Sequence, residues 1–133
     1  MEGYKLIEVP KISDKRGCLS FIEEDNHIPF KISRAFWIYD VPGSEVRGQH
    51  AHKECHELMV AISGSFEVEI DDGRNENTVV LDQPHHGLYI SPGIWTTVKD
   101  FSPGAVCLVF VSHKYNEEDY IHNYQDYLNL NDG

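Results

Sequence analysis

Short apolar runs separated by turn dipeptides recur about every ten residues along this chain. The runs span residues 18–23, 35–41, 56–63, 65–71, 78–82, 87–91 and 105–112. Between them lie five dipeptides whose backbone preferences suit turns: Pro42-Gly43, Ser63-Gly64, Asp72-Gly73, Pro92-Gly93 and Pro103-Gly104. So many short strands in 133 residues predict an all-β sandwich or barrel.

Two of these runs indicate how their strands are covered. Residues 65–71, SFEVEID, alternate apolar side chains with glutamates, which is typical of a strand with one buried face. The Asp72-Gly73 dipeptide that follows favours a hairpin turn. Residues 105–112, AVCLVFVS, show no polar alternation, so we expect a strand that is covered on both faces.

The end of the chain has a different periodicity. In residues 116–130, Asn116 is a candidate N-cap and acidic residues follow it in the first turn. Apolar side chains then recur at helical spacing, at Tyr120, Ile121, Tyr124, Tyr127 and Leu128. We therefore expect a short C-terminal helix packed against the β body. No repeat or linker interrupts the pattern, which predicts one domain over residues 1–133.

Charge and cysteine content restrict the partners. The net charge is -11, which disfavours broad contact with nucleic acid or an anionic membrane, so an anionic ligand would need a local basic pocket. The N-terminus lacks a signal-peptide pattern, and no apolar run approaches the ~20 residues that cross a bilayer. The three widely spaced cysteines fit reduced thiols better than a disulfide framework, so we expect a cytoplasmic protein.

The most concentrated titratable chemistry lies in residues 47–57, RGQHAHKECHE. If residues 48–52 are extended, His50 and His52 project from the same face, because side chains alternate along a strand. Imidazoles with ordinary pKa values near 6.5 suit proton transfer at physiological pH. Together with Glu57 they could instead hold iron, manganese or zinc. Glu57 could also orient a histidine or be an exposed carboxylate.

The spacing from His50 to Gly64 resembles the first motif of the cupin superfamily: HxH, four residues, Glu, six residues, Gly. The resemblance implies a cupin-type jelly-roll β-barrel, in which metal-binding members use the two histidines and the glutamate as ligands. In the matching second stretch, GLYISPGIWTTVKDF, Thr96 and Thr97 stand where a third histidine is expected. The metal set is incomplete, so proton transfer without a metal or other cofactor is the leading interpretation.

Longer stretches resemble a more specific family. RGQHAHK, together with DKRGCLSFIEE, IPFKISRAFWIYDVPG, GLYISPGIW and NEEDYI, is similar to the WxcM-like cupin family of sugar nucleotide 3,4-ketoisomerases, also called 3,4-oxoisomerases. The resemblance covers nearly the whole chain. It implies conversion of dTDP-4-keto-6-deoxyglucose to a dTDP-3-keto-6-deoxyhexose without a metal, with His50 and His52 as catalytic residues. It also implies a homodimer with exchanged N-terminal strands.

The family's place in metabolism and the stereochemistry are further expectations from the resemblance. The product would feed an aminotransferase in the biosynthesis of 3-amino-3,6-dideoxy sugars for lipopolysaccharide or other glycans. Arg16, in DKRG, resembles the galacto-forming members, which favours a galacto product. Two alternatives remain open: a metal-dependent cupin enzyme, and a non-catalytic sugar-binding cupin.

Binding a nucleoside diphosphate calls for cationic and aromatic side chains. The fork of arginine suits phosphate oxygens, and aromatic rings can stack on a base or flank a sugar. The expected substrate-binding residues are Arg16, Arg34, Arg47, Lys53, Tyr39 and Trp95. Arg16 could instead pair with Asp14, Glu23 or Glu24. The isolated histidines are most simply surface or turn residues: His27, His85, His86, His113 and His122.

Overall fold

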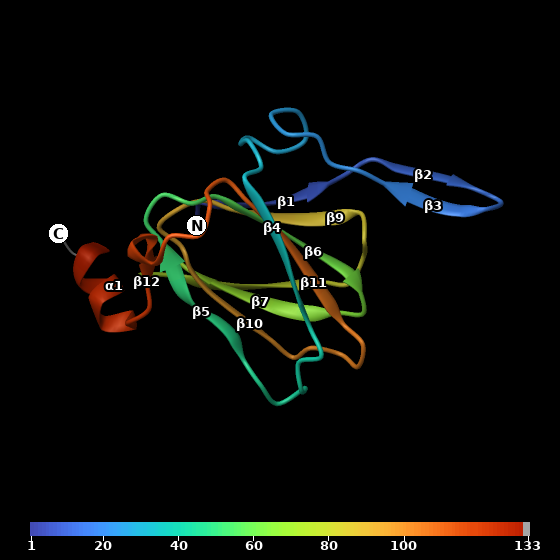
Figure 1. The fold of residues 1–133 in the computed structure, drawn as a ribbon. Helices are drawn as coiled ribbons and strands as arrows, with labels where there is room; N and C mark the ends of the chain where they lie inside the picture. The colour runs from blue at the N-terminus through green and yellow to red at the C-terminus, as the bar shows by residue number, and fades with distance from the viewer. Residues whose placement is uncertain (132–133) are drawn as a thin grey trace.

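The computed structural model describes residues 1–131, which form twelve strands, a 3-10 turn and one helix (Figure 1). The strands are β1 (Tyr4–Glu8), β2 (Lys11–Asp14), β3 (Gly17–Ser20), β4 (Arg34–Tyr39), β5 (Arg47–His52), β6 (Glu57–Ser63), β7 (Phe66–Asp71), β8 (Glu76–Leu81), β9 (His86–Ile90), β10 (Trp95–Lys99), β11 (Val106–Val111) and β12 (Tyr120–Ile121). The 3-10 turn is η1 (Glu117–Asp119) and the helix is α1 (Tyr124–Asn131).

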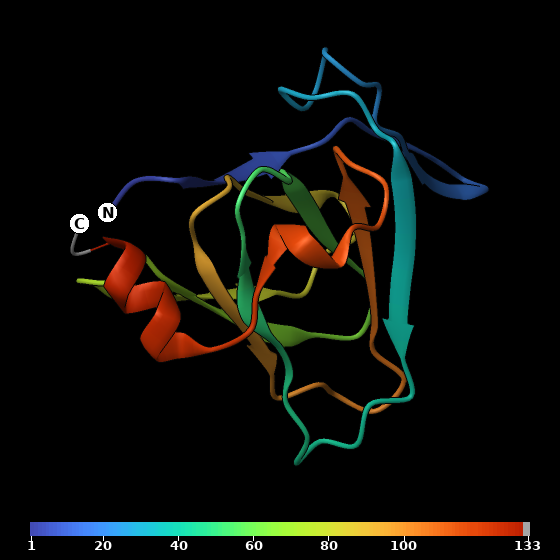
Figure 2. The same ribbon diagram turned by 60° about the vertical axis from the view of Figure 1, so that its left-hand side comes forward.

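Ten of the strands form two five-stranded sheets. One has the order β1-β9-β6-β11-β4 and the other β12-β5-β10-β7-β8. The two sheets lie one above the other, as Figures 1 and 2 show from different sides. The prediction of an all-β jelly roll with a short C-terminal helix is confirmed. In the described part of the chain the two sheets stay separate and do not close into one continuous barrel.

The core between the sheets draws on both layers. Its members on β7 and β11 are at most 1% exposed: Phe66, Val68, Ile70, Cys107, Val109 and Val111. The alternation predicted for residues 65–71 is therefore confirmed. The other face of β11 is also covered, since Phe110 packs against a second cluster that contains Ile28 and Phe30. Each large apolar side chain buried in this way contributes about 1.5–3 kcal/mol to folding.

One turn between strands requires glycine. Gly64, between β6 and β7, has a φ of +66°, and a Cβ at this position would lie 2.8 Å from the Cα of Ala105. Any other residue here would be destabilising, because its side chain disfavours the left-handed backbone conformation and would clash with Ala105. The Ser63-Gly64 turn predicted from the sequence is thus confirmed. Packing explains why its second residue, which is also the glycine of the cupin-like spacing, has to be glycine.

The prediction of a helix that begins directly after Asn116 is wrong for the first half of the segment. Asn116 does act as a cap, because its side chain accepts a hydrogen bond from the backbone N of Glu118, but it caps η1. The next residues form β12, which pairs with the end of β5, and α1 begins only at Tyr124. Pairing with β5 overrides the helical spacing of the apolar residues. The helix packs on the β body as expected, since Tyr127 is buried and donates a hydrogen bond to the carbonyl of Gly93.

Five strands were absent from the set of apolar runs: β1, β2, β5, β10 and β12. Of these, only the β5 region was considered as extended, through residues 48–52. The threonines of β10 hide it, because they interrupt its apolar pattern although they favour strands as β-branched residues. The segment predicted over residues 18–23 is shorter in the structure, where β3 ends at Ser20.

The hairpin formed by β2 and β3 stands apart from both sheets and projects from the body in both views (Figures 1 and 2). All eight of its strand residues are exposed, including the cross-strand apolar pair Ile12 and Leu19, each 57% exposed. No helix in residues 1–131 is long and apolar enough to cross a membrane.

Candidate active site

A bulge in β5 sets up the site. Gly48 and Gln49 have φ values of +81° and +57°, and the pairing of β5 with β10 shifts register beside them. A Cβ at Gly48 would lie 2.9 Å from the carbonyl oxygen of Thr96, so the glycine of the RGQHAH run lets the two strands approach closely. Beyond the bulge the strand is regular, and the rings of His50 and His52 lie side by side with centroids 5.1 Å apart.

His50 lines a cavity of about 330 Å³, within the range of small-molecule sites. Both sheets contribute to its wall, which consists of Phe36, Ile38, Val46, Arg47, Gly48, His50, Glu57, Met59, Thr96, Val98, Val109 and Tyr120. Apolar and polar side chains share the wall, and the polar groups gather around His50. This arrangement leaves a few polar side chains to orient a ligand.

His52 lies behind His50, between two carboxylates. Its Nδ1 is 2.8 Å from Oδ2 of Asp119, and its Nε2 is 3.3 Å from Oε1 of Glu57. The side chains of His52 and Glu57 are each only 5% exposed. Asp119 is itself fixed, because its other carboxylate oxygen accepts a hydrogen bond of 2.7 Å from the backbone N of Glu54. The carboxylates hold the imidazole in one orientation.

The surroundings drive the pKa values of the two histidines apart. Burial lowers the pKa of His50, and the positive charge of a protonated His52 adds to this, while Glu57 opposes it. Burial also lowers the pKa of His52, but its hydrogen bonds and charge attraction to Glu57 and Asp119 outweigh burial, so the pKa is raised. His50 therefore favours its neutral, basic form and His52 favours its protonated form. Such a separation is typical of a pair in which one group accepts a proton and the other holds one.

Thr96 and Tyr120 complete the polar part of the wall. Thr96 Oγ1 is buried and has no hydrogen-bond partner among the described residues. A buried polar atom without a partner costs free energy unless a ligand or water satisfies it, so this hydroxyl is available to a bound molecule. The ring of Tyr120 lies 5.0 Å from His50 and 4.5 Å from His52, which fixes both imidazoles from the open side.

The expected binding residues fall into two groups. Arg47 lines the cavity and also a neighbouring hollow that includes Tyr39. Arg34 lies beside the cavity, where its Nη2 donates a hydrogen bond of 3.4 Å to the hydroxyl of Tyr120 and its guanidinium covers the ring of Phe36 at 5.0 Å. Arg34 and Arg47 thus lie near His50, whereas Tyr39 lies in the neighbouring hollow.

The remaining expected residues lie elsewhere in the subunit. Trp95 is buried against the rings of Tyr124 and Tyr127 beneath α1, and it does not line the cavity. Lys53 is exposed just after β5. Arg16 is at the tip of the projecting hairpin, where it forms an exposed ion pair of 2.7 Å with Asp14.

Sequence reasoning missed Asp119 and left Glu57 undecided. Asp119 belongs to the acidic run that was interpreted as the first turn of a helix, and only the pairing of β12 with β5 brings it to His52. A signal was present in the sequence. Three acidic residues follow Asn116 directly, which is more than a helix N-terminus needs, so one of them was free for another role. Glu57 is buried and lines the cavity, so it is not an exposed carboxylate.

The same side chains define the metal-dependent alternative. His50, His52 and Glu57 each offer one ligand atom, and these atoms lie within 4.8 Å of one another. A cupin metal site has a further histidine on the strand where this chain has Thr96. Only three candidate ligands among residues 1–131 therefore remain at this site. Asp119 already engages Nδ1 of His52, so an ion would have to displace the contact between Nε2 and Glu57.

Comparisons with known proteins decide the family. The model of the family described as "FdtA: WxcM-like, C-terminal" matches residues 2–132. The chain belongs to this WxcM-like family. A curated relative from Aneurinibacillus thermoaerophilus, TDP-4-oxo-6-deoxy-alpha-D-glucose-3,4-oxoisomerase, is 43% identical over 123 residues, which are 92% of this chain and 88% of the relative. The family expected from the sequence is confirmed.

Solved structures of the WxcM-like type superpose closely on the chain. A variant of the 3,4-ketoisomerase QdtA from Thermoanaerobacterium thermosaccharolyticum, in complex with TDP-4-keto-6-deoxyglucose, matches with a TM-score of 0.96 and 36% identity over 98% of this chain and 94% of that chain. A 3,4-ketoisomerase from Helicobacter canadensis matches with a TM-score of 0.95 and 38% identity over 98% of each chain.

Proposed function

We propose that the protein converts dTDP-4-keto-6-deoxyglucose into a dTDP-3-keto-6-deoxyhexose in the His50 cavity. Its family and its relatives make the chain an isomerase of the sugar nucleotide 3,4-ketoisomerase class. The observation that carries the catalytic proposal is the pair formed by a neutral His50 at the cavity wall and a protonated His52 behind it. The free cysteines of the chain fit a reducing compartment, and we place the enzyme in the cytoplasm.

The reaction moves a ketone by two proton transfers at carbon. The C4 ketone acidifies the hydrogen on C3, and a base removes it to give an enediolate shared by the two carbons. A proton then passes from the oxygen on C3 to the oxygen on C4. Protonation of C4 leaves the ketone on C3, so the proton lost from C3 is balanced by the proton gained at C4 and no external oxidant or reductant is needed. The site must supply a carbon base, an oxygen-to-oxygen relay and donors for the developing negative charge.

The residues around the cavity match these needs. His50 is the base, because its lowered pKa keeps Nε2 or Nδ1 free to accept the C3 proton. The relay is the pair of His52 and Glu57, of which Glu57 lines the cavity and reaches the sugar oxygens. The partnerless hydroxyl of Thr96 is a donor for the enediolate. General acid-base help of this kind typically supplies ~10²- to 10⁴-fold of the rate.

The function is tested by following the carbon-bound hydrogens. The protein is incubated with dTDP-4-keto-6-deoxyglucose in deuterated water with an excess of chelator, and C3 and C4 are observed by NMR. We expect deuterium at the exchanging carbons and accumulation of the 3-keto sugar, with full turnover in the chelator. Activity that the chelator abolishes and one divalent metal restores would instead establish the metal-dependent cupin enzyme. Binding of the sugar nucleotide without exchange or turnover would establish a non-catalytic cupin.

Arg47 is proposed to hold the diphosphate. The Arg47→Ala variant is expected to bind dTDP more weakly by about 1.5–3 kcal/mol, the range for hydrogen bonds to charged groups, with an unchanged fold. Isothermal titration calorimetry measures the change. Arg74→Ala is the matched control, because Arg74 is an exposed arginine in the turn between β7 and β8. Equal dissociation constants for wild type and Arg47→Ala would remove Arg47 from the phosphate site.

We also propose that the enzyme is a homodimer whose N-terminal hairpins are exchanged. The support is that, within residues 1–131, β2 and β3 pair with no other strand and leave the apolar side chains of Ile12 and Leu19 more than half exposed. Exchange would bring Arg16 to the partner subunit. We keep the galacto product as part of this proposal, with transfer of nitrogen to C3 as the following reaction in 3-amino-3,6-dideoxy sugar biosynthesis.

The dimer proposal predicts an effect of charge in the hairpin. Ile12→Asp is expected to convert the protein from dimer to monomer, because it places a carboxylate in the apolar contact that the hairpin would make. Light scattering coupled to size-exclusion chromatography measures the mass. Val80→Asp is the control, since Val80 is an exposed apolar residue of β8 on one of the main sheets. A wild type that is monomeric at all concentrations would refute the exchange.

A further inference from the structure

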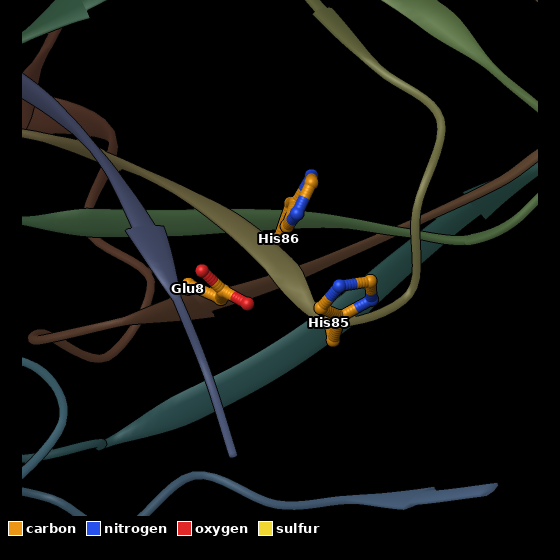
Figure 3. Close-up of side chains that lie close together, drawn as sticks. All are labelled: Glu8, His85 and His86. Carbon is orange, nitrogen blue, oxygen red and sulfur yellow. The ribbon is translucent and has the colours of Figure 1, made fainter. Parts of the chain in front are cut away.

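A further group of side chains that could ligate a metal lies outside the cavity, where β1 runs beside the start of β9. Glu8 ends β1 and pairs with His86, the first residue of β9, and His85 directly precedes it. Figure 3 shows the three side chains gathered at this point. Each offers one ligand atom, and these atoms lie within 4.8 Å of one another. None of the three lines the His50 cavity, so the isomerase reaction does not use them.

The backbone explains why two consecutive histidines lie together. In a regular strand their side chains would point to opposite faces. Here His85 belongs to a turn, which the backbone N of His86 closes by donating to the carbonyl of Gln83 at 3.1 Å. The ring centroids of His85 and His86 are therefore only 4.3 Å apart. The carbonyl of His85 in turn accepts a hydrogen bond of 2.8 Å from the backbone N of Val9, which fixes the turn beside β1.

The donor set matches a borderline transition-metal ion. Two imidazoles and one carboxylate with an open fourth position suit Zn²⁺, whose bonds to nitrogen and carboxylate oxygen are about 2.0–2.2 Å. Ligand atoms around such an ion lie roughly 3.4 Å apart, so the three groups have to approach by no more than ~1–1.5 Å. Side-chain rotation supplies this movement, because both histidines are half-buried and Glu8 is exposed. The net charge of -11 favours a dication further.

We propose that Glu8, His85 and His86 bind a Zn²⁺ ion that fastens the base of the N-terminal hairpin to the body. Val9 and Pro10 are the only residues between β1 and β2, so they are the hinge of the hairpin. An ion held by Glu8 on one side and by the two histidines on the other links the start of this hinge to the turn before β9. It adds to the single backbone hydrogen bond between Val9 and His85.

Zinc affinity tests the site. Competition with a chromophoric zinc chelator is measured in the His52→Asn background. This change removes one ligand from each of the other two groups that could hold a metal, His50-His52-Glu57 and His52-Cys55-Asp119. We expect the additional change His85→Ala/His86→Ala to weaken zinc binding by at least ~10-fold. Loss of a residue that only hydrogen-bonds to a metal ligand already weakens metal binding this much, and loss of a ligand itself should cost at least as much. The matched control, His27→Ala/His113→Ala in the same background, removes two histidines elsewhere and should bind as the background does. Equal affinity in all three proteins would overturn the site.

Hydrogen exchange tests the hinge. Zinc is expected to slow exchange of the Val9 amide in the wild-type protein and to leave it unchanged in His85→Ala/His86→Ala. An exchange rate that zinc does not alter in the wild type would overturn the fastening of the hinge. The turnover of His85→Ala/His86→Ala should equal that of the wild type in the isomerase assay. The zinc result is thus independent of the proposed isomerase activity, since either can fail while the other stands.

Discussion

Replacement of His50 by asparagine is expected to lower isomerisation by at least ~10²-fold and to lower exchange of the C3 hydrogen with solvent equally. Asparagine keeps a similar bulk and hydrogen-bonding capacity but cannot accept a proton near neutral pH, so the variant removes chemistry more than packing. The dissociation constant for dTDP should stay within about threefold of wild type, a difference under 1 kcal/mol, because Arg47 and not His50 is proposed to hold the diphosphate. NMR of the deuterium-labelled sugar and calorimetry give the two readings.

The control for this variant is His113→Asn, which changes an exposed histidine that does not line the cavity and should leave turnover unchanged. Wild-type C3 exchange in His50→Asn would show that another group abstracts the proton. A tenfold or greater loss of dTDP affinity would show that His50 also positions the nucleotide. The first outcome would leave His50 as a positioning residue.

Replacement of Asp119 by asparagine is expected to move the alkaline limb of the pH-rate profile to lower pH. Asp119 raises the pKa of His52, and a neutral amide no longer does so. Losing this opposite charge lowers the pKa of His52, so turnover on the alkaline side should fall, by roughly 10-fold or more. The substitution is mild for the fold, because the amide oxygen of asparagine can still accept the hydrogen bond from the backbone N of Glu54.

The direction of the shift follows from the roles of the two histidines. The proposed base His50 must be neutral, so turnover rises with pH through its lowered pKa. This acid limb should move less than the alkaline limb in Asp119→Asn, because it depends on Asp119 only through the charge of His52. The proton holder His52 must be protonated, so turnover falls as pH rises through its raised pKa, and this is the limb that should move. Asp126→Asn, which alters an exposed acid of α1, is the control. An alkaline limb at the wild-type position would refute the link from Asp119 to His52.

Local patterns were enough for much of the fold. The alternation in residues 65–71 and the unbroken apolar run in residues 105–112 predicted the faces that β7 and β11 bury, because a side chain's face depends only on its neighbours along the strand. The turn glycines were predictable because the backbone preference of glycine is also a local property. The helix beginning after Asn116 was not, since helical spacing competes there with strand pairing to β5, which lies more than sixty residues earlier in the chain.

The candidate site divides in the same way. The sequence by itself determined that His50 and His52 lie together, because residues two apart on one strand project from the same face. It also determined the WxcM-like family, through stretches spread over the chain. Only the tertiary structure shows what drives the pKa values of the two histidines apart, and this supports the proposal that His50 is the base. That separation depends on burial and on Glu57 and Asp119, and the second of these reaches His52 from sixty-seven residues away. The pairing of Glu8 with His85 and His86 was equally hidden, because a turn and a distant strand create it. Periodicity records contacts along one strand, whereas pKa values and ligand sets depend on groups that long-range packing brings together.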